Sequence, residues 1–145
     1  MTLSQKKYSQ DLLRRAGMLQ CKTAGTPMSA LDKLSTLDGV PLSADDATEY
    51  RSIVGGLQYL TITRPDISYD VNRVYQYLHA PRDSHWTAAK RILRYIQLTV
   101  SFSMLLRPAP SGVLSAFSHA DWVGNPADRR STGGYAVFHG PNLIA

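Results

Sequence analysis

The sequence predicts an α+β protein in which a helical region comes first and a small antiparallel β-sheet follows. Two observations predict this order. Apolar residues recur at helical spacing up to about residue 98, and the chain then changes to short β-like runs separated by proline and glycine. Segregation of helices from strands argues against a repeating βαβ arrangement.

The first part of the helical region is expected to hold two helices joined by a long loop. Apolar residues recur on one side of residues 4–16, and Gly17 stands where a helix stop is expected. Residues 18–43 lack this periodicity and contain several prolines and glycines, so they are expected to be irregular. A second helix then starts with Asp45-Asp46 as cap candidates and ends at Arg64-Pro65.

An adjacent glycine pair, Gly55-Gly56, lies inside the second expected helix. Each glycine costs a helix about 1 kcal/mol relative to alanine, so a close approach by another chain segment or by a nucleic-acid strand is expected there. Packing within the protein is the favoured explanation.

A third helix is expected after Asp66, which is its cap candidate. Ile67, Val71, Val74 and Leu78 form an apolar stripe along it, and the helix is expected to end before a proline at position 81. The stripe is expected to be core.

The fourth expected helix opens at Asp83 or Ser84, runs to about residue 98 and has two distinct faces. Its apolar side consists of Trp86, Ala89, Ile92, Leu93 and Ile96. Lys90, Arg91 and Arg94 lie on the other side with no acidic residue among them. This basic arc is either an ordinary solvated face or a contact surface for phosphates, and both interpretations stay open.

Composition agrees with one ordinary domain or two small ones in 145 residues. Sixteen Lys and Arg against eleven Asp and Glu give a net charge of +5, which suits a nucleic-acid partner. The single cysteine, Cys21, cannot form an internal disulfide, so a reducing compartment such as cytoplasm or nucleus is favoured. No apolar run approaches the roughly 20 residues of a membrane helix, so no membrane contact is expected.

The β-like runs cover residues 102–106, 113–118 and 135–139, and residues 142–144 read as the beginning of another strand. We expect this sheet to be looser than the helical region and to leave an unpaired edge. Self-association through that edge is a possible consequence.

Two motifs near the end of the sequence resemble the start of the ribonuclease H domain in copia-type retrotransposon polyproteins. They are the runs Phe117-Ser118-His119-Ala120-Asp121-Trp122 and Asp128-Arg129-Arg130-Ser131-Thr132-Gly133-Gly134-Tyr135. Other segments resemble reverse transcriptase of the same family beyond its palm, and they are Leu3-Ser4-Gln5-Lys6-Lys7-Tyr8, Tyr50-Arg51-Ser52-Ile53-Val54-Gly55-Gly56-Leu57-Gln58-Tyr59-Leu60, Thr63-Arg64-Pro65-Asp66-Ile67 and Lys90-Arg91-Ile92-Leu93-Arg94-Tyr95.

The resemblance implies two domains. Residues 1–99 would be the C-terminal, thumb- or connection-like helical region of the reverse transcriptase, and residues 100–145 a truncated start of a ribonuclease H-like domain. An RNA–DNA hybrid or another nucleic acid is then the expected partner.

The resemblance also implies that neither catalytic centre is intact. The polymerase carboxylates would lie before Met1, and the later ribonuclease H carboxylates would lie after Ala145. The family's first metal-binding aspartate corresponds to His119, a neutral imidazole that suits Mg²⁺ poorly. Asp121 is the nearest surviving carboxylate, and it is expected to cap a turn or to pair with Arg129 or Arg130. No metal site and no cofactor are expected for the chain alone, although the intact family uses Mg²⁺.

Three functional hypotheses follow from this. The chain is a catalytically inactive piece of a retrotransposon reverse transcriptase/ribonuclease H polyprotein, or a nucleic-acid-binding module. In the second case Lys90, Arg91, Arg94, Arg129 and Arg130 would contact phosphates. The third hypothesis is that it forms part of an active RNA-directed DNA polymerase/ribonuclease H when joined to the missing segments.

Overall fold

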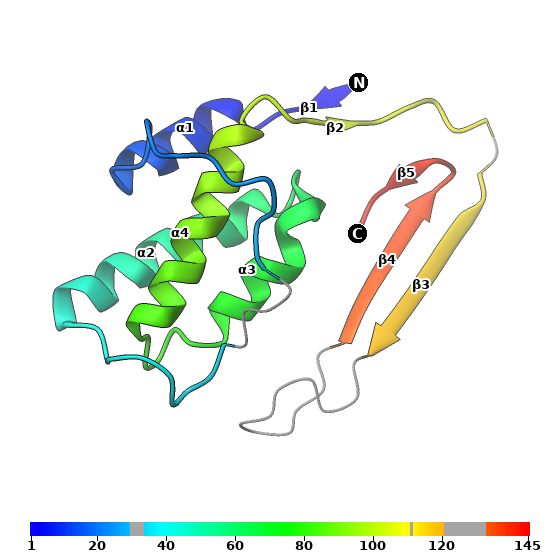
Figure 1. The fold of residues 1–145 in the computed structure, drawn as a ribbon. Helices are drawn as coiled ribbons and strands as arrows, with labels where there is room; N and C mark the ends of the chain where they lie inside the picture. Colours follow the sequence, from blue (N-terminus) through cyan, green and yellow to red (C-terminus); the bar gives the residue numbers. More distant parts are fainter. Residues whose placement is uncertain (30–33, 111, 121–132) are drawn as a thin grey trace. The chain divides into compact units, whose positions relative to one another are not determined.

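The computed structural model describes residues 1–29, 34–110, 112–120 and 133–145 and divides them into two compact units (Figure 1). The helical unit is Ser4–Met104, and the sheet unit consists of Met1–Leu3 with Leu105–Ala145. Helices and antiparallel strands are segregated, which confirms the α+β class. The identity of the two predicted domains, and the ribonuclease H type of the sheet, stay predictions.

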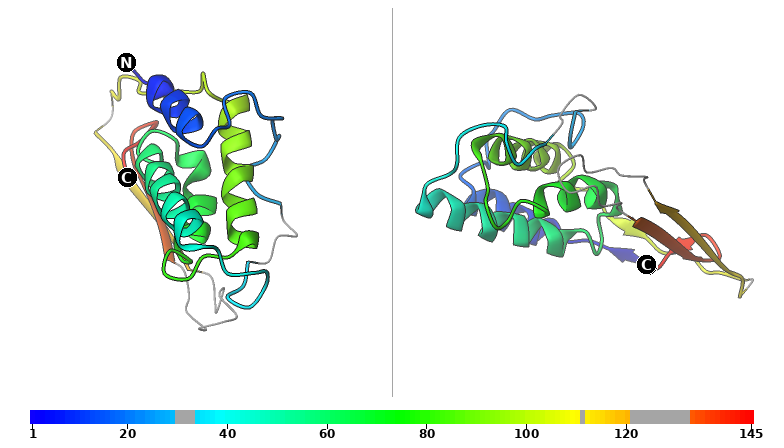
Figure 2. Two further views of the ribbon diagram at one scale, coloured as in Figure 1. Left: turned by 90° about the vertical axis from the view of Figure 1, so that its left-hand side faces the viewer. Right: turned by 90° about the horizontal axis from the view of Figure 1, so that it is seen from below.

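The helical unit is built from helices before and after the long loop predicted at residues 18–43. They are α1 (Lys6–Arg15), α2 (Ala44–Leu60), the 3₁₀ turn η1 (Pro65–Ile67), α3 (Ser68–Tyr75) and α4 (Asp83–Leu98). Figure 2 shows α1 to α4 gathered into one bundle. In the part of the chain that the structure describes, no helix is long and apolar enough to span a membrane.

One hydrophobic core lies between these helices. The residues in it with 1% exposure or less are Leu12, Leu13, Tyr50, Ile53, Val54, Leu57, Leu60, Ile67, Val71, Val74, Ala89, Ile92, Leu93 and Ile96. The apolar side expected for the fourth helix is confirmed, with Trp86 partly buried at its edge. In the third stripe Ile67, Val71 and Val74 are buried, but the predicted helix end is wrong, because α3 ends at Tyr75 and the partly buried Leu78 lies beyond it. All buried hydrophobic residues found in the described ranges belong to the helical unit.

The helix starts differ from two of the predictions. Ser43, not the Asp45-Asp46 pair, caps α2, because its hydroxyl accepts a hydrogen bond from the Asp46 backbone N–H at 3.1 Å. Asp66 does not cap α3, because a 3₁₀ turn precedes that helix and the Asp66 carboxylate is bound to Arg64. The predicted stop at Gly17 is confirmed by its φ of +64°, which glycine adopts without strain.

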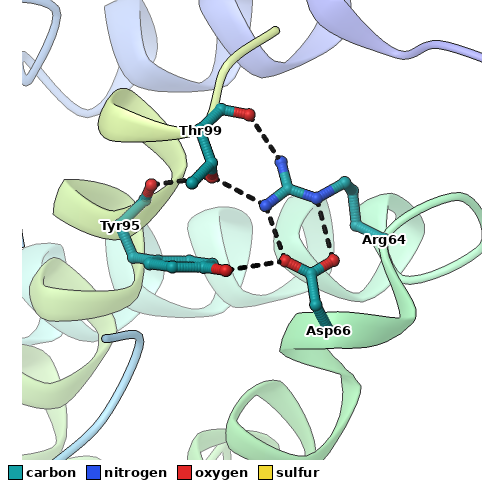
Figure 3. Close-up of polar contacts among 4 residues, drawn as sticks. All are labelled: Arg64, Asp66, Tyr95 and Thr99. Atoms are coloured by element: carbon teal, nitrogen blue, oxygen red, sulfur yellow. Dashed lines mark hydrogen bonds and ion pairs between the residues drawn. The ribbon is translucent and has the colours of Figure 1, made fainter. Parts of the chain in front are cut away.

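Arg64 is a buried cation that joins the start of η1 to the end of α4 (Figure 3). Its guanidinium donates two hydrogen bonds to the Asp66 carboxylate, at 2.9 and 2.8 Å, and reaches the backbone carbonyl and the hydroxyl of Thr99 at 3.1 and 2.7 Å. The Tyr95 hydroxyl donates to the same carboxylate at 3.1 Å. Thr99 directly follows α4, so the guanidinium also lies at the negative end of the helix dipole.

The Asp66 carboxylate responds to this arrangement. Partial burial raises its pKa, but the hydrogen bonds and charge of Arg64 and the hydroxyl of Tyr95 outweigh burial and hold the pKa below the ordinary 3.8. Asp66 is therefore ionised at neutral pH, and the pair is charged on both sides.

The two glycines of α2 lie in different surroundings. A Cβ on Gly56 would come within 2.6 Å of Leu12 Cδ1 and 3.3 Å of the Tyr8 hydroxyl, both on α1. A Cβ on Gly55 would meet nothing within 4 Å. Gly56 thus allows α1 to pack closely on α2, which supports the packing explanation for one glycine of the pair.

The sheet unit contains β3 (Leu114–Ala120), β4 (Gly133–His139) and β5 (Asn142–Leu143) in the order β3-β4-β5. All pairs are antiparallel, and Phe117 stands opposite Ala136. β5 confirms the strand expected at residues 142–144, and β3 is one edge of the sheet. A second, two-stranded sheet was not predicted. It joins β1 (Thr2–Leu3) to β2 (Met104–Leu105).

Alanine at the two glycines should have opposite effects on stability. Gly55→Ala is expected to raise the free energy of unfolding by about 0.5–1 kcal/mol, because alanine favours a helix and the site is open. Gly56→Ala is expected to lower it by about 1 kcal/mol, since the new methyl group displaces Leu12 and overpacking outweighs helix propensity. Urea unfolding of both variants tests this, and equal effects would contradict it.

Removing the Arg64 guanidinium should destabilise the helical unit strongly. Arg64→Met is expected to lower the free energy of unfolding by about 2–4 kcal/mol, because the Asp66 carboxylate and the Thr99 carbonyl lose their partner. Arg14→Met is the matched control, since Arg14 forms an exposed pair with Asp11 and such pairs contribute about 0–1 kcal/mol. Similar losses in the two variants, measured by urea unfolding, would show that the Arg64 contacts are unimportant.

Candidate nucleic-acid interface

The three predicted basic residues of α4, Lys90, Arg91 and Arg94, differ in what their side chains contact. The Lys90 ammonium lies 4.9 Å from the centroid of the Trp86 ring, in a cation–π contact. Arg91 and Arg94 instead line a groove on the neighbouring side of the helix. Arg94 is exposed, and Lys90 and Arg91 are half-buried. Arg91 and Arg94 thus line the same groove, and Lys90 lies outside its lining, against Trp86.

The groove has a volume of about 780 Å³ and runs along α4. Its helical side is formed by Asp83, Ser84, Thr87, Ala88, Arg91 and Arg94, which recur at helical spacing. Its other side is formed by the loop between α1 and α2, through Lys22, Thr23, Ala24, Gly25, Leu34 and Asp38. The long loop predicted at residues 18–43 therefore supplies one wall of this groove.

The two ends of the groove differ in charge. At the end near the C-terminus of α4, the loop lies against the arginines, because the Ala24 N–H donates to the Arg94 carbonyl at 3.3 Å and Arg91 donates to the Thr26 hydroxyl at 2.9 Å. Lys22 lines the groove beside them. At the other end lie Asp38 and Asp83.

The acidic end is held by several hydrogen bonds between the loop and the start of α4. Asp83 Oδ1 accepts from the Val40 backbone N–H at 2.9 Å, and the Ser84 hydroxyl donates to the Asp38 carbonyl at 2.9 Å. Gly39 makes the approach possible, since its φ is +86° and a Cβ there would overlap Asp83 Oδ1. Both ends of the wall are therefore pinned to the helix.

The buried side chain of His85 also holds the loop between α1 and α2, through a hydrogen bond to Ser35. Its ring is fully buried, stacks on Tyr77 with the centroids 3.9 Å apart, and accepts the Arg82 backbone N–H at Nδ1 over 3.1 Å. With Nδ1 as acceptor, Nε2 carries the proton and donates to the Ser35 carbonyl at 2.9 Å. Burial is the largest influence and lowers the pKa of His85 below 6.5, opposed by the Ser35 carbonyl. The imidazole is thus neutral at pH 7.

The predicted residues of the sheet unit contribute less. His119 is exposed on β3 opposite Gly134. Asp121, Arg129 and Arg130 lie outside the described residues. Within the described ranges no group of three His, Cys, Asp or Glu side chains is placed to hold a metal ion. Because Asp121 lies outside these ranges, the metal-binding expectation for this region stays a prediction.

Sequence reasoning missed Lys22, Asp38 and Asp83 as groove residues. Lys22 and Asp38 lie in an irregular loop with no periodicity to place them, and Asp83 was read only as a helix start. The one usable signal was Gly39, a residue suited to a tight loop next to a helix start.

The sequence matches transposon polyproteins along almost its whole length. It is 48% identical over 143 residues to the retrovirus-related Pol polyproteins from transposons RE2 and RE1 of Arabidopsis thaliana, which covers 99% of this chain and 10% of each polyprotein. It is 34% identical over 139 residues to the retrovirus-related Pol polyprotein from transposon TNT 1-94 of Nicotiana tabacum, again 10% of that protein. The chain belongs to the family of retrovirus-related Pol polyproteins of transposons.

The chain spans about a tenth of the length of each of these three polyproteins. No protein-family profile matches the chain. No solved structure matches it either.

Acidification should weaken the contact between the loop and α4. The pKa of His85 in the folded chain is below 6.5, so the unfolded chain binds a proton at His85 more readily. The contribution of His85 to folding stability is therefore complete above about pH 6.5 and falls as the pH decreases below that value. Urea unfolding between pH 5 and 8 measures the effect. In His85→Gln the decrease between these pH values should be smaller, and an unchanged slope would contradict the role of His85.

Proposed function

We propose that this chain is the reverse transcriptase/ribonuclease H segment of a transposon Pol polyprotein, and that its helical unit binds the backbone of an RNA–DNA hybrid. The observation that carries the binding proposal is the gathering of Lys22, Arg91 and Arg94 around one end of a groove, with Lys90 on the next face of α4. Arginine and lysine at such a surface bind phosphate oxygens without reading the base sequence.

The charge of the chain supports the same proposal. Its net charge of +5 attracts a polyanion, and neutralising phosphates releases counterions, so binding should weaken with salt. The Lys90 ammonium lies 4.9 Å from the centroid of the Trp86 ring, and this cation–π contact leaves its charge unneutralised.

For catalysis we propose that the chain cleaves no hybrid by itself. His119 stands at the position of the family's first metal-binding aspartate, and an imidazole does not replace a carboxylate as a ligand of Mg²⁺. The alternative is that the chain is part of an active RNA-directed DNA polymerase/ribonuclease H when joined to further segments. The tenfold greater length of its relatives favours testing this by complementation.

Binding to an RNA–DNA hybrid should depend on salt and on the basic residues of α4. The triple variant Lys90→Ala, Arg91→Ala and Arg94→Ala is expected to bind more weakly regardless of sequence, and the slope of log affinity against log salt should fall by about one for each phosphate that the variant no longer neutralises. Fluorescence anisotropy with a labelled hybrid measures both quantities. Lys7→Ala is the control, because Lys7 is an exposed charge on α1.

The same hybrid should stay intact when it is incubated with the chain and Mg²⁺ or Mn²⁺. Absence of binding at low salt would refute the binding proposal. Metal-dependent cleavage that Asp121→Ala abolishes would refute the proposal of catalytic inactivity.

A further inference from the structure

We propose that the groove along α4 binds one nucleotide unit at a phosphorylated strand end, with its phosphate at the basic end of the groove and its sugar and base toward Asp38 and Asp83. This inference rests on the proposed nucleic-acid function and assigns the ligand of that site. It comes from the distribution of charge along the groove.

The basic end is arranged to hold a single phosphate group. Arg91 and Arg94 are three residues apart on α4, about 4.5 Å along the helix, so both guanidinium groups can reach the same anion. Lys22 approaches from the loop on the other side. Arg91 donates through Nη2 to the Thr26 hydroxyl, and its Nε is buried without a hydrogen-bond partner among the described residues. The donor left for an anion in the groove is therefore Nη1.

The acidic end disfavours a phosphate backbone that runs the whole length of the groove. Asp83 lies eight residues before Arg91 on α4, about 12 Å along the helix axis. A strand running the length of the groove would bring further phosphates against Asp38 and Asp83, and like charges repel. A strand that ends in the groove avoids this repulsion.

Carboxylates can instead recognise the neutral part of a nucleotide. In nucleotide and DNA complexes, aspartate and glutamate accept hydrogen bonds from ribose hydroxyls and from base amino groups. Asp83 uses Oδ1 for the backbone N–H groups of Val40 and Ser84, which leaves Oδ2 for such a donor. A ligand with an anion at one end and donors at the other therefore matches the groove.

Small side chains along the helix leave room for this ligand. Ser84, Thr87 and Ala88 separate the acidic end from Arg91, and the volume of about 780 Å³ lies within the roughly 300–1,000 Å³ of small-ligand sites. The loop is pinned to α4 at Ala24, Thr26, Asp38 and Val40, so the groove exists before the ligand binds.

The test compares short single-stranded oligonucleotides with and without a terminal phosphate, in ribose and deoxyribose forms and at the 5′ or the 3′ end. The full chain is expected to bind a phosphorylated end at least about fivefold more tightly than the same strand without it. Fluorescence anisotropy measures the ratio, and circular dichroism confirms that each variant is folded.

Three variants identify the groove as the source of this ratio. Arg94→Ala removes a cation from the basic end, and Thr87→Tyr fills the groove without changing charge, so both should reduce the ratio to about one. Lys7→Ala is the control, because Lys7 is an exposed cation on α1 that does not line the groove, and it should leave the ratio unchanged.

The outcomes separate this inference from the function on which it rests. Equal binding of phosphorylated and unphosphorylated ends, or an unchanged ratio in Thr87→Tyr, would overturn the groove assignment even if the hybrid still binds with a steep salt dependence. Loss of all nucleic-acid binding at low salt would overturn both.

Discussion

The helical unit depends on the burial of one cation. A guanidinium that is removed from water must be paired and hydrogen-bonded, or it destabilises the fold by several kcal/mol. Arg64 meets this requirement with Asp66 two residues away and with Thr99 at the end of α4. The contact therefore joins the turn after α2 to the C-terminus of α4 and limits the positions that α4 can take.

The position of α4 in turn decides the candidate site. One side of this helix fills the core through Ala89, Ile92, Leu93 and Ile96. A second side carries Arg91 and Arg94, and hydrogen bonds hold the loop between α1 and α2 against it to form the groove. Ordering a long loop costs conformational entropy. Here the hydrogen bonds of the loop to α4 offset that cost, because α4 is itself held in place by the core. The site consequently combines residues more than sixty positions apart in the sequence, such as Lys22 and Arg91.

Membership in the family of transposon Pol polyproteins and the geometry of the groove bear on different questions. The family relationship extends over almost the whole chain. The structure adds that the segment Thr63-Arg64-Pro65-Asp66-Ile67 contains the buried ion pair. The groove is described by its own charges and volume. Its basic end and its acidic end differ in charge, and this difference is the basis of the ligand proposed for it.

Sequence alone determined the α+β class, the approximate extent of the helices and the apolar sides of α3 and α4, because these depend on periodicity and on local start and stop signals. Only the tertiary structure decided that Ser43 caps α2 and that Asp66 pairs with Arg64. It also decided that α1 packs closely against Gly56. Finally, it decided that Arg91 and Arg94 share a groove with Lys22, while Lys90 does not line it. Each of these depends on residues distant in sequence or on competition between partners for one side chain. Periodicity contains no information about either, since it describes one element at a time.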